Sequence, residues 1–149
     1  MGASEAGIGA AVRCARVRLV DVLQLPSARM RRYALLALVP FFVLAGINHF
    51  RDPDVYLAMM PGYLPAHDVL VAASGVLEIA GGVGVLVPRL RSRIGWGLVA
   101  LLVAVFPANL HMALNPQLFP DLPATALWAR LPVQILFIAW CLWATGDER

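Results

Sequence analysis

Four long apolar stretches constrain this chain more than any other feature of its sequence; they lie at about residues 33–50, 69–87, 94–114 and 127–145. A helix needs about 20 mostly apolar residues to cross the ~30 Å hydrocarbon core of a bilayer. Hydrophobic residues make up 60% of the chain and charged residues 14%, which leaves too few polar side chains to cover a water-soluble fold of 149 residues. The sequence therefore predicts an all-α fold, a membrane four-helix bundle.

The basic residues predict the orientation of this bundle. All 12 are arginines, and ten of them fall on one side of the four predicted spans. These ten are Arg13, Arg16, Arg18, Arg29, Arg31, Arg32, Arg89, Arg91, Arg93 and Arg149, whereas Arg51 and Arg130 fall on the other side. Because positive charge is retained in the cytoplasm, both termini are predicted to be cytoplasmic, in a multi-pass protein of the inner (cytoplasmic) membrane. Arginines that flank apolar runs, without forming a basic stripe, argue against nucleic-acid binding.

Outside the spans, the sequence predicts less regular structure. Residues 1–30 form an Arg-rich cytoplasmic tail, either disordered or interfacial, and translation from Met30 is an equal alternative. Residues 31–149 form the transmembrane domain. Between the first two spans we expect a short interfacial helix, capped by Asp52 or Asp54. Three prolines between residues 115 and 123 predict an irregular segment without a helix.

The polar residues of the four spans are predicted to lie at similar depth. They are Asn48, His49, Ser74, Glu78, Asn109, His111, Arg130 and Gln134. In the predicted orientation, all of them fall in the outer half of the membrane or at its centre. Polar side chains inside a membrane usually face the interior of a bundle or a water-filled cavity. We therefore expect them to line one ligand-binding pocket that is open to the outer side.

Glu78 has the strongest claim to function among these residues, because an ionised carboxylate in hydrocarbon must be paired, hydrated or neutralised. The other residues have structural alternatives. Asn48, Asn109 and Gln134 would hydrogen-bond between helices, His49 and His111 would lie at the interface, and Arg130 would pair with Glu78 or reach the headgroups. Two histidines and a carboxylate suggest a metal triad, but counting along the helices separates Glu78 from both histidines by a helical turn or more. No metal site is predicted.

Several motifs in chain order resemble the DoxX family of small bacterial membrane proteins. They are Gly46-Ile47-Asn48-His49-Phe50, Pro61-Gly62-Tyr63-Leu64-Pro65, Ser74-Gly75-Val76-Leu77-Glu78-Ile79-Ala80-Gly81-Gly82, Val87-Pro88-Arg89, Val105-Phe106-Pro107-Ala108-Asn109 and Arg130-Leu131-Pro132-Val133-Gln134. The resemblance covers about residues 31–145 and implies a four-helix membrane protein. It also implies an association with membrane sulfur oxidation, methylamine utilisation or thiol and oxidative-stress systems, usually as an accessory subunit.

Three functions follow as hypotheses. The first is an accessory subunit of a membrane redox system, not an enzyme on its own, which binds a small lipophilic or quinone-like molecule and no other cofactor. Its partners would be the lipid bilayer and a membrane or soluble redox protein, with a homo-oligomer left open. The second is a membrane scaffold or assembly factor whose polar cluster is purely structural. The third is a small proton-coupled permease, which the absence of paired broken helices makes the weakest.

Overall fold

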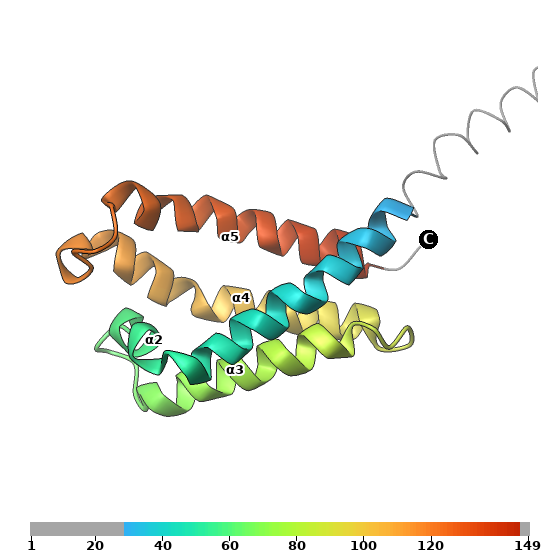
Figure 1. Ribbon diagram of the computed structural model, residues 1–149, viewed down its shortest axis with the longest axis horizontal. Helices are drawn as coiled ribbons and strands as arrows, with labels where there is room; N and C mark the ends of the chain where they lie inside the picture. The colour runs from blue at the N-terminus through green and yellow to red at the C-terminus, as the bar shows by residue number, and fades with distance from the viewer. Residues whose placement is uncertain (1–28, 147–149) are drawn as a thin grey trace, which may run out of the picture. The chain divides into compact units, whose positions relative to one another are not determined.

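The computed structural model describes residues 29–146, which are all-helical apart from the connections (Figure 1). The elements are the first helix (Arg29–Arg51), α2 (Pro53–Met59), α3 (His67–Gly84), α4 (Arg91–Leu114), the 3₁₀ helix η1 (Pro116–Leu118) and α5 (Ala124–Thr145). The chain divides into two units, residues 1–33 and 34–149. In the first unit the described residues, 29–33, are helical. The predicted tail up to residue 28 and Arg149 lie outside the described residues. The second unit holds everything that follows.

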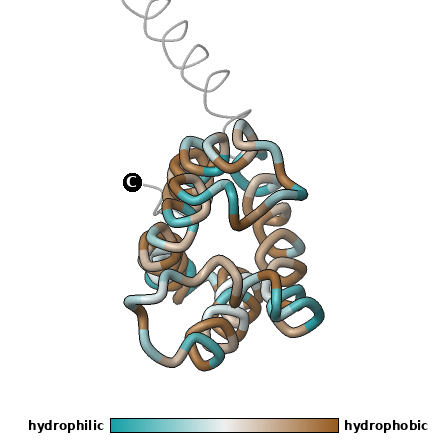
Figure 2. The backbone as a smooth tube through the Cα atoms, turned by 90° about the vertical axis from the view of Figure 1, so that its left-hand side faces the viewer, coloured by the Kyte–Doolittle hydropathy of each residue, from teal (hydrophilic) through white to brown (hydrophobic). Residues whose placement is uncertain are grey.

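Four helices within residues 29–146 are long and apolar enough to cross a membrane: the first helix, α3, α4 and α5. In the most apolar 18-residue stretch of each helix, only 17–28% of the residues are buried inside the protein. Many large hydrophobic residues of these helices are consequently exposed, and Figure 2 shows that hydrophobic residues recur along the helices. Such surfaces suit lipid and not water. The structure thus fits the predicted multi-pass membrane protein with four helical spans.

Helix boundaries differ from the prediction at two prolines. The second span was expected to reach Val87, but α3 ends at Gly84 and the chain continues in tight turns, with Val87 N donating to Gly84 O over 3.0 Å. Pro88 contributes to the early end, because it has no N–H to donate to the Gly84 carbonyl and disfavours the helical conformation of Val87. The last span was expected to begin at about residue 127. α5 begins earlier, at Ala124, so Pro132 lies well inside this helix, where it removes one backbone hydrogen bond.

The connections also depart in part from the prediction. The expected short helix is present as α2, with Asp52 at its N-cap position. Neither predicted cap forms, because no side-chain hydrogen bond closes the start of α2; Pro53, at its first position, needs no N–H partner. The segment 115–123 was expected to lack a helix, but it contains η1. Pro116 starts this single turn, which is the position in a short helix that proline tolerates best.

The second unit has two apolar cores, one toward each end of the helices. The larger joins the first helix, α4 and α5, together with the turn that follows α3; its buried members are Leu35, Leu38, Phe42, Val85, Leu98, Val99, Leu102, Cys141 and Ala144. The smaller joins α2, α4 and α5 through Met59, Ala108, Met112 and Leu127. α2 packs against both α3 and α4. The two cores leave a space between them, in the half of the bundle nearer α2.

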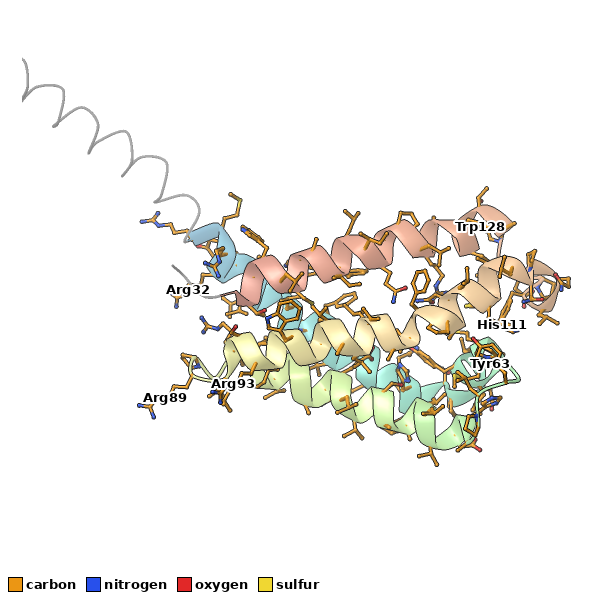
Figure 3. The ribbon with its side chains drawn as sticks, turned by 180° about the vertical axis from the view of Figure 1, so that it is seen from behind. Arg32, Tyr63, Arg89, Arg93, His111 and Trp128 are labelled. Carbon is orange, nitrogen blue, oxygen red and sulfur yellow. The ribbon has the colours of Figure 1, made fainter. Side chains whose placement is uncertain are left out.

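The two ends of the helices differ in chemistry. Arg89 and Arg93 lie at one end, in the connection from α3 to α4 and in the first turn of α4 (Figure 3). Tyr63, His111 and Trp128 lie at the opposite end (Figure 3). We call these the arginine end and the α2 end.

Candidate functional site

A cavity of about 520 Å³ occupies the space between the two cores. Its walls come from the first helix, α2, α3, α4 and α5 and are mostly apolar. The larger apolar and aromatic residues of the lining are Phe41, Phe42, Tyr56, Met59, Met60 and Phe137. The polar residues of the lining are His49, Ser74, Glu78, Asn109, Arg130 and Gln134. A cavity of this size and composition falls in the range of small-molecule sites.

Two glycines next to this cavity bring the first helix and α3 into close contact. A Cβ atom placed on Gly75 would lie 3.0 Å from the Gly46 carbonyl oxygen and 2.8 Å from the His49 Cβ atom. Both helices therefore need glycine here, because any side chain would push them apart. The contact sets His49 of the first helix level with Gly75 of α3. Glu78 follows Gly75 by three residues, about 4.5 Å along the helix axis, which the two long side chains can bridge.

His49 is consequently the partner of Glu78. Its Nε2 atom lies 3.4 Å from Glu78 Oε2, and the exposed fractions of the two side chains are 8% and 12%. The expected separation of a helical turn or more along the helices therefore does not keep the two side chains apart, because they bridge an axial offset of about 4.5 Å. The glycine contact sets His49 level with Gly75, and the two side chains bridge the remaining three residues to Glu78. Arg130, the partner considered from the sequence, makes no ion pair with Glu78 within the described chain.

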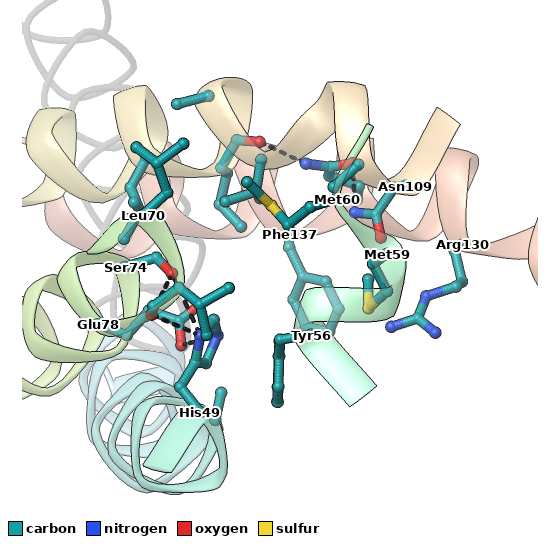
Figure 4. A pocket seen from close by; sticks show the side chains of 18 of the residues that line it. His49, Tyr56, Met59, Met60, Leu70, Ser74, Glu78, Asn109, Arg130 and Phe137 are labelled. Carbon is teal, nitrogen blue, oxygen red and sulfur yellow. Dashed lines mark hydrogen bonds and ion pairs between the residues drawn. The ribbon is translucent and has the colours of Figure 1, made fainter. Parts of the chain in front are cut away.

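The other side of the His49 ring is held by α3. Nδ1 lies 3.0 Å from the Val71 carbonyl oxygen and 3.2 Å from the Ser74 hydroxyl (Figure 4). The Ser74 hydroxyl in turn donates to the same Val71 carbonyl over 2.9 Å. A carbonyl oxygen can only accept, so Nδ1 must carry a proton. These bonds fix both the tautomer and the orientation of the ring, with Nε2 facing Glu78.

Tyr56 of α2 covers one face of the His49 ring. The two rings stack with their centroids 3.7 Å apart and an angle of 27° between their planes. Asn48 Nδ2 donates to the Tyr56 hydroxyl over 3.2 Å. Tyr56 was not among the eight predicted site residues, so its part in the cavity was missed. An aromatic residue in a short helix next to the His49 segment was the available signal, but nothing in the sequence indicates which way α2 folds back.

A second polar group lies across the cavity, on α4 and α5. Asn109 Nδ2 donates to Gln134 Oε1 over 3.1 Å, and Gln134 Nε2 makes a short hydrogen bond to the Leu102 carbonyl oxygen. Figure 4 shows Asn109 on the opposite side of the cavity from Ser74, Glu78 and His49. The cavity thus has two polar ends, separated by apolar walls. We call them the His49 end and the Asn109 end.

Arg130 adds a cation to the cavity from α5, where its side chain is exposed. The remaining two of the eight predicted site residues, Asn48 and His111, are not among the residues that line the cavity. Helical phase explains both cases. Asn48 is rotated by about 100° from His49, and His111 by about 200° from Asn109, so neither faces the same way as its neighbour. The structure therefore brings six of the eight predicted residues together.

His111 is half-buried in a different environment. Its Nδ1 atom is enclosed and has no hydrogen-bond partner among the described residues, while its carbonyl oxygen accepts from Asn115 Nδ2 over 2.9 Å. Within residues 29–146, no group of three or more His, Cys, Asp or Glu side chains could hold a metal ion. The His49–Glu78 pair lacks a third such ligand there. What the cavity offers is instead an apolar volume with hydrogen-bonding groups at two ends.

One comparison with known proteins gives a result. Residues 38–145 match a family model described as Domain of unknown function (DUF8561). No curated protein matches the chain, and no solved structure does. The matched region contains every residue that lines the cavity.

Proposed function

We propose that this chain, which belongs to the DUF8561 family, is a membrane-embedded binding protein for a small lipophilic, quinone-like molecule. The observation that supports the proposal is the cavity of about 520 Å³, with a polar group at each end and apolar walls between them. Ligand sites of this kind hold the body of a molecule by apolar contact and its orientation by a few polar groups. A six-membered ring with polar substituents at opposite positions matches this pattern.

The proposal extends to the role of the bound molecule. The resemblance to the DoxX family supports an accessory subunit of a membrane redox system, which would hold the molecule for a partner protein. The excess of arginine at the arginine end supports an orientation in which that end is cytoplasmic. The cavity, which is nearer the α2 end, would then lie in the outer half of the inner membrane.

Binding can be tested directly with the protein in lipid nanodiscs. The probes are a 1,4-benzoquinone that carries a decyl chain and the corresponding hydroquinone. The measurement is the amount of each probe that the nanodiscs retain, compared with empty nanodiscs of the same lipid. We expect saturable retention of at least one probe, at one molecule per protein. Equal retention by loaded and empty nanodiscs would refute the proposal.

Two substitutions on α4 show where the probe binds. Ala104 lines the cavity, whereas Ala100, one turn earlier, is exposed outside it. We expect Ala104→Phe to fill the cavity and lower probe affinity about tenfold or more, which corresponds to about 1.4 kcal/mol. Ala100→Phe adds the same side chain on the outer face and should leave probe affinity unchanged. If Ala104→Phe binds the probe as the unmodified protein does, the binding site lies elsewhere.

A membrane scaffold is the second candidate, and one observation favours it. The bonds from Gln134 to Asn109 and Leu102 tie α5 to α4, as expected of polar residues that fix helix packing. A scaffold would show no saturable retention of either probe. The proteins that copurify with it would then define its function.

A further inference from the structure

The donors at the His49 end of the cavity are already in use. The proton on Nδ1 is shared by the Val71 carbonyl and the Ser74 hydroxyl. The Ser74 hydroxyl proton points to the same carbonyl. Neither group can therefore donate to a molecule in the cavity without giving up a buried hydrogen bond, and lost buried hydrogen bonds are expensive.

The contact between His49 and Glu78 also leaves no free donor. With Nδ1 protonated, the neutral forms of both groups place one proton on the carboxyl group. On Oε2 this proton faces the lone pair of Nε2, whereas on Oε1 it would leave two lone pairs facing each other across the contact. The charged forms place that proton on Nε2. In both states that proton faces the other atom across 3.4 Å, a contact in which the structure shows no formed hydrogen bond, and Oε2 is enclosed by protein. In both states the carboxyl group of Glu78, which lines the cavity, keeps an oxygen that can accept.

The other polar groups of the lining do not change this result. The titratable or charged residues there are His49, Tyr56, Glu78 and Arg130. The Tyr56 hydroxyl accepts from Asn48 Nδ2 over 3.2 Å and keeps its own proton, but Asn48 belongs to a separate hollow and is not part of the lining, so this hydroxyl is held beside a residue outside the cavity. Arg130 projects from α5, on the Asn109 side of the cavity (Figure 4). The His49 end of the cavity therefore offers a hydrogen-bond acceptor to a ligand. The free hydrogen-bond donors of the cavity lie at the Asn109 end.

We infer that the His49 end selects ligands that donate a hydrogen bond, which are hydroxyl compounds of the phenol or hydroquinone type, with Glu78 as the accepting group. This inference rests on the proposed function and narrows it to one chemical class. A carbonyl or ether oxygen placed at this end would face the carboxyl oxygen of Glu78 with no proton between them. Sites built around a buried hydrogen bond discriminate strongly against analogues that cannot make it.

A pair of stable probes isolates this hydrogen bond. The phenol is 4-octylphenol and the matched ether is 4-octylanisole, which has the same chain and ring but no hydroxyl proton. Both are titrated into the full-length protein in nanodiscs, with empty nanodiscs subtracted. We expect the phenol to bind at least about tenfold more tightly, because a hydrogen bond to a charged or strongly polar buried group has at least this effect.

Substitutions assign the preference to Glu78. Glu78→Leu should abolish the preference for the phenol, since no acceptor remains. His111→Leu, also a polar-to-apolar change in a span but outside the cavity, should retain the preference. Equal binding of phenol and ether to the unmodified protein would overturn the inference and leave the proposed cavity intact. Binding of none of the phenol, the ether or the quinone pair would refute the proposed function itself. Should Glu78→Leu fail to fold, the comparison of phenol and ether on the unmodified protein still decides the question.

Discussion

Gly75 determines the geometry of the His49 end, although it carries no functional group. Its missing side chain lets the first helix approach α3 until His49 can reach Glu78 and Ser74. The chemistry of the pair therefore depends on a backbone contact and not on the identity of the two polar residues alone. A small change at Gly75 would separate groups that are each still present.

At Gly75 we predict that alanine destabilises the protein by about 1–3 kcal/mol, the usual effect of overpacking. A Cβ atom there would lie 2.8 Å from His49 Cβ and 2.9 Å from Phe50 Cε2. The matched control is Gly97→Ala in α4, where an added Cβ meets nothing within 4 Å. That control should be neutral or stabilise by up to about 1 kcal/mol, because alanine is the better helix former. The measurement is thermal unfolding in detergent, and equal midpoints for the two variants would contradict the packing account.

At the scale of elements, α4 is the helix to which the others attach. It packs against α2, α3 and α5, and it carries members of both apolar cores. The polar contact between α4 and α5 lies between these two cores, at the Asn109 end of the cavity. Apolar packing alone would allow α5 to slide along α4, because one apolar contact in lipid resembles another. The amide bonds of Gln134 fix the register of these two helices.

Gln134→Leu should destabilise the protein by about 1 kcal/mol, and its effect should not add to that of Asn109→Leu. Gln134 accepts from Asn109 and donates to the Leu102 carbonyl, so each single variant already breaks their shared bond. In a double-mutant cycle we expect a coupling of about 0.5–2 kcal/mol. Unfolding in increasing denaturant provides the measurement. Pairing Gln134→Leu with His111→Leu is the control, and its effects should add. An additive result for Asn109 would show that the amide bond contributes nothing.

For the whole molecule, the asymmetry between its ends predicts how it sits in the membrane. The arginine end carries Arg89 and Arg93 but the α2 end carries Tyr63 and Trp128. Positive charge favours the cytoplasmic side, and aromatic residues favour either interface. The arginine end is therefore expected inside and the α2 end outside, with the cavity nearer the outer surface.

Labelling of introduced cysteines in intact cells tests this orientation. Ser92→Cys reports on the arginine end, whereas Tyr63→Cys and Pro120→Cys report on the α2 end. An impermeant maleimide should label the latter two and leave Ser92→Cys unlabelled until the cells are opened. The unsubstituted protein is the control for its own cysteines, of which Cys141 is buried. Labelling of Ser92→Cys from outside would reverse the orientation and place the cavity toward the cytoplasm.

The sequence by itself determined the number of long apolar helices and their approximate bounds. The reason is physical: a segment that must satisfy all its backbone hydrogen bonds inside lipid is a helix of a given length and composition. It also indicated that Glu78 is exceptional, since a carboxylate in an apolar span needs a partner. Helical phase was present in the sequence as well. It would have removed Asn48 and His111 from the predicted site.

The tertiary structure decided which groups meet. The partner of Glu78 depends on how closely the first helix and α3 pack, and Gly46 and Gly75 act there only through a long-range contact. The place of Tyr56 depends on the direction in which α2 turns back, which a seven-residue helix does not specify locally. The pattern of apolar residues predicts which residues avoid water. In a membrane it does not predict which helices contact each other, because lipid and the protein interior are equally apolar. The acceptor at the His49 end and the amide pair at the Asn109 end are therefore properties of the packed bundle.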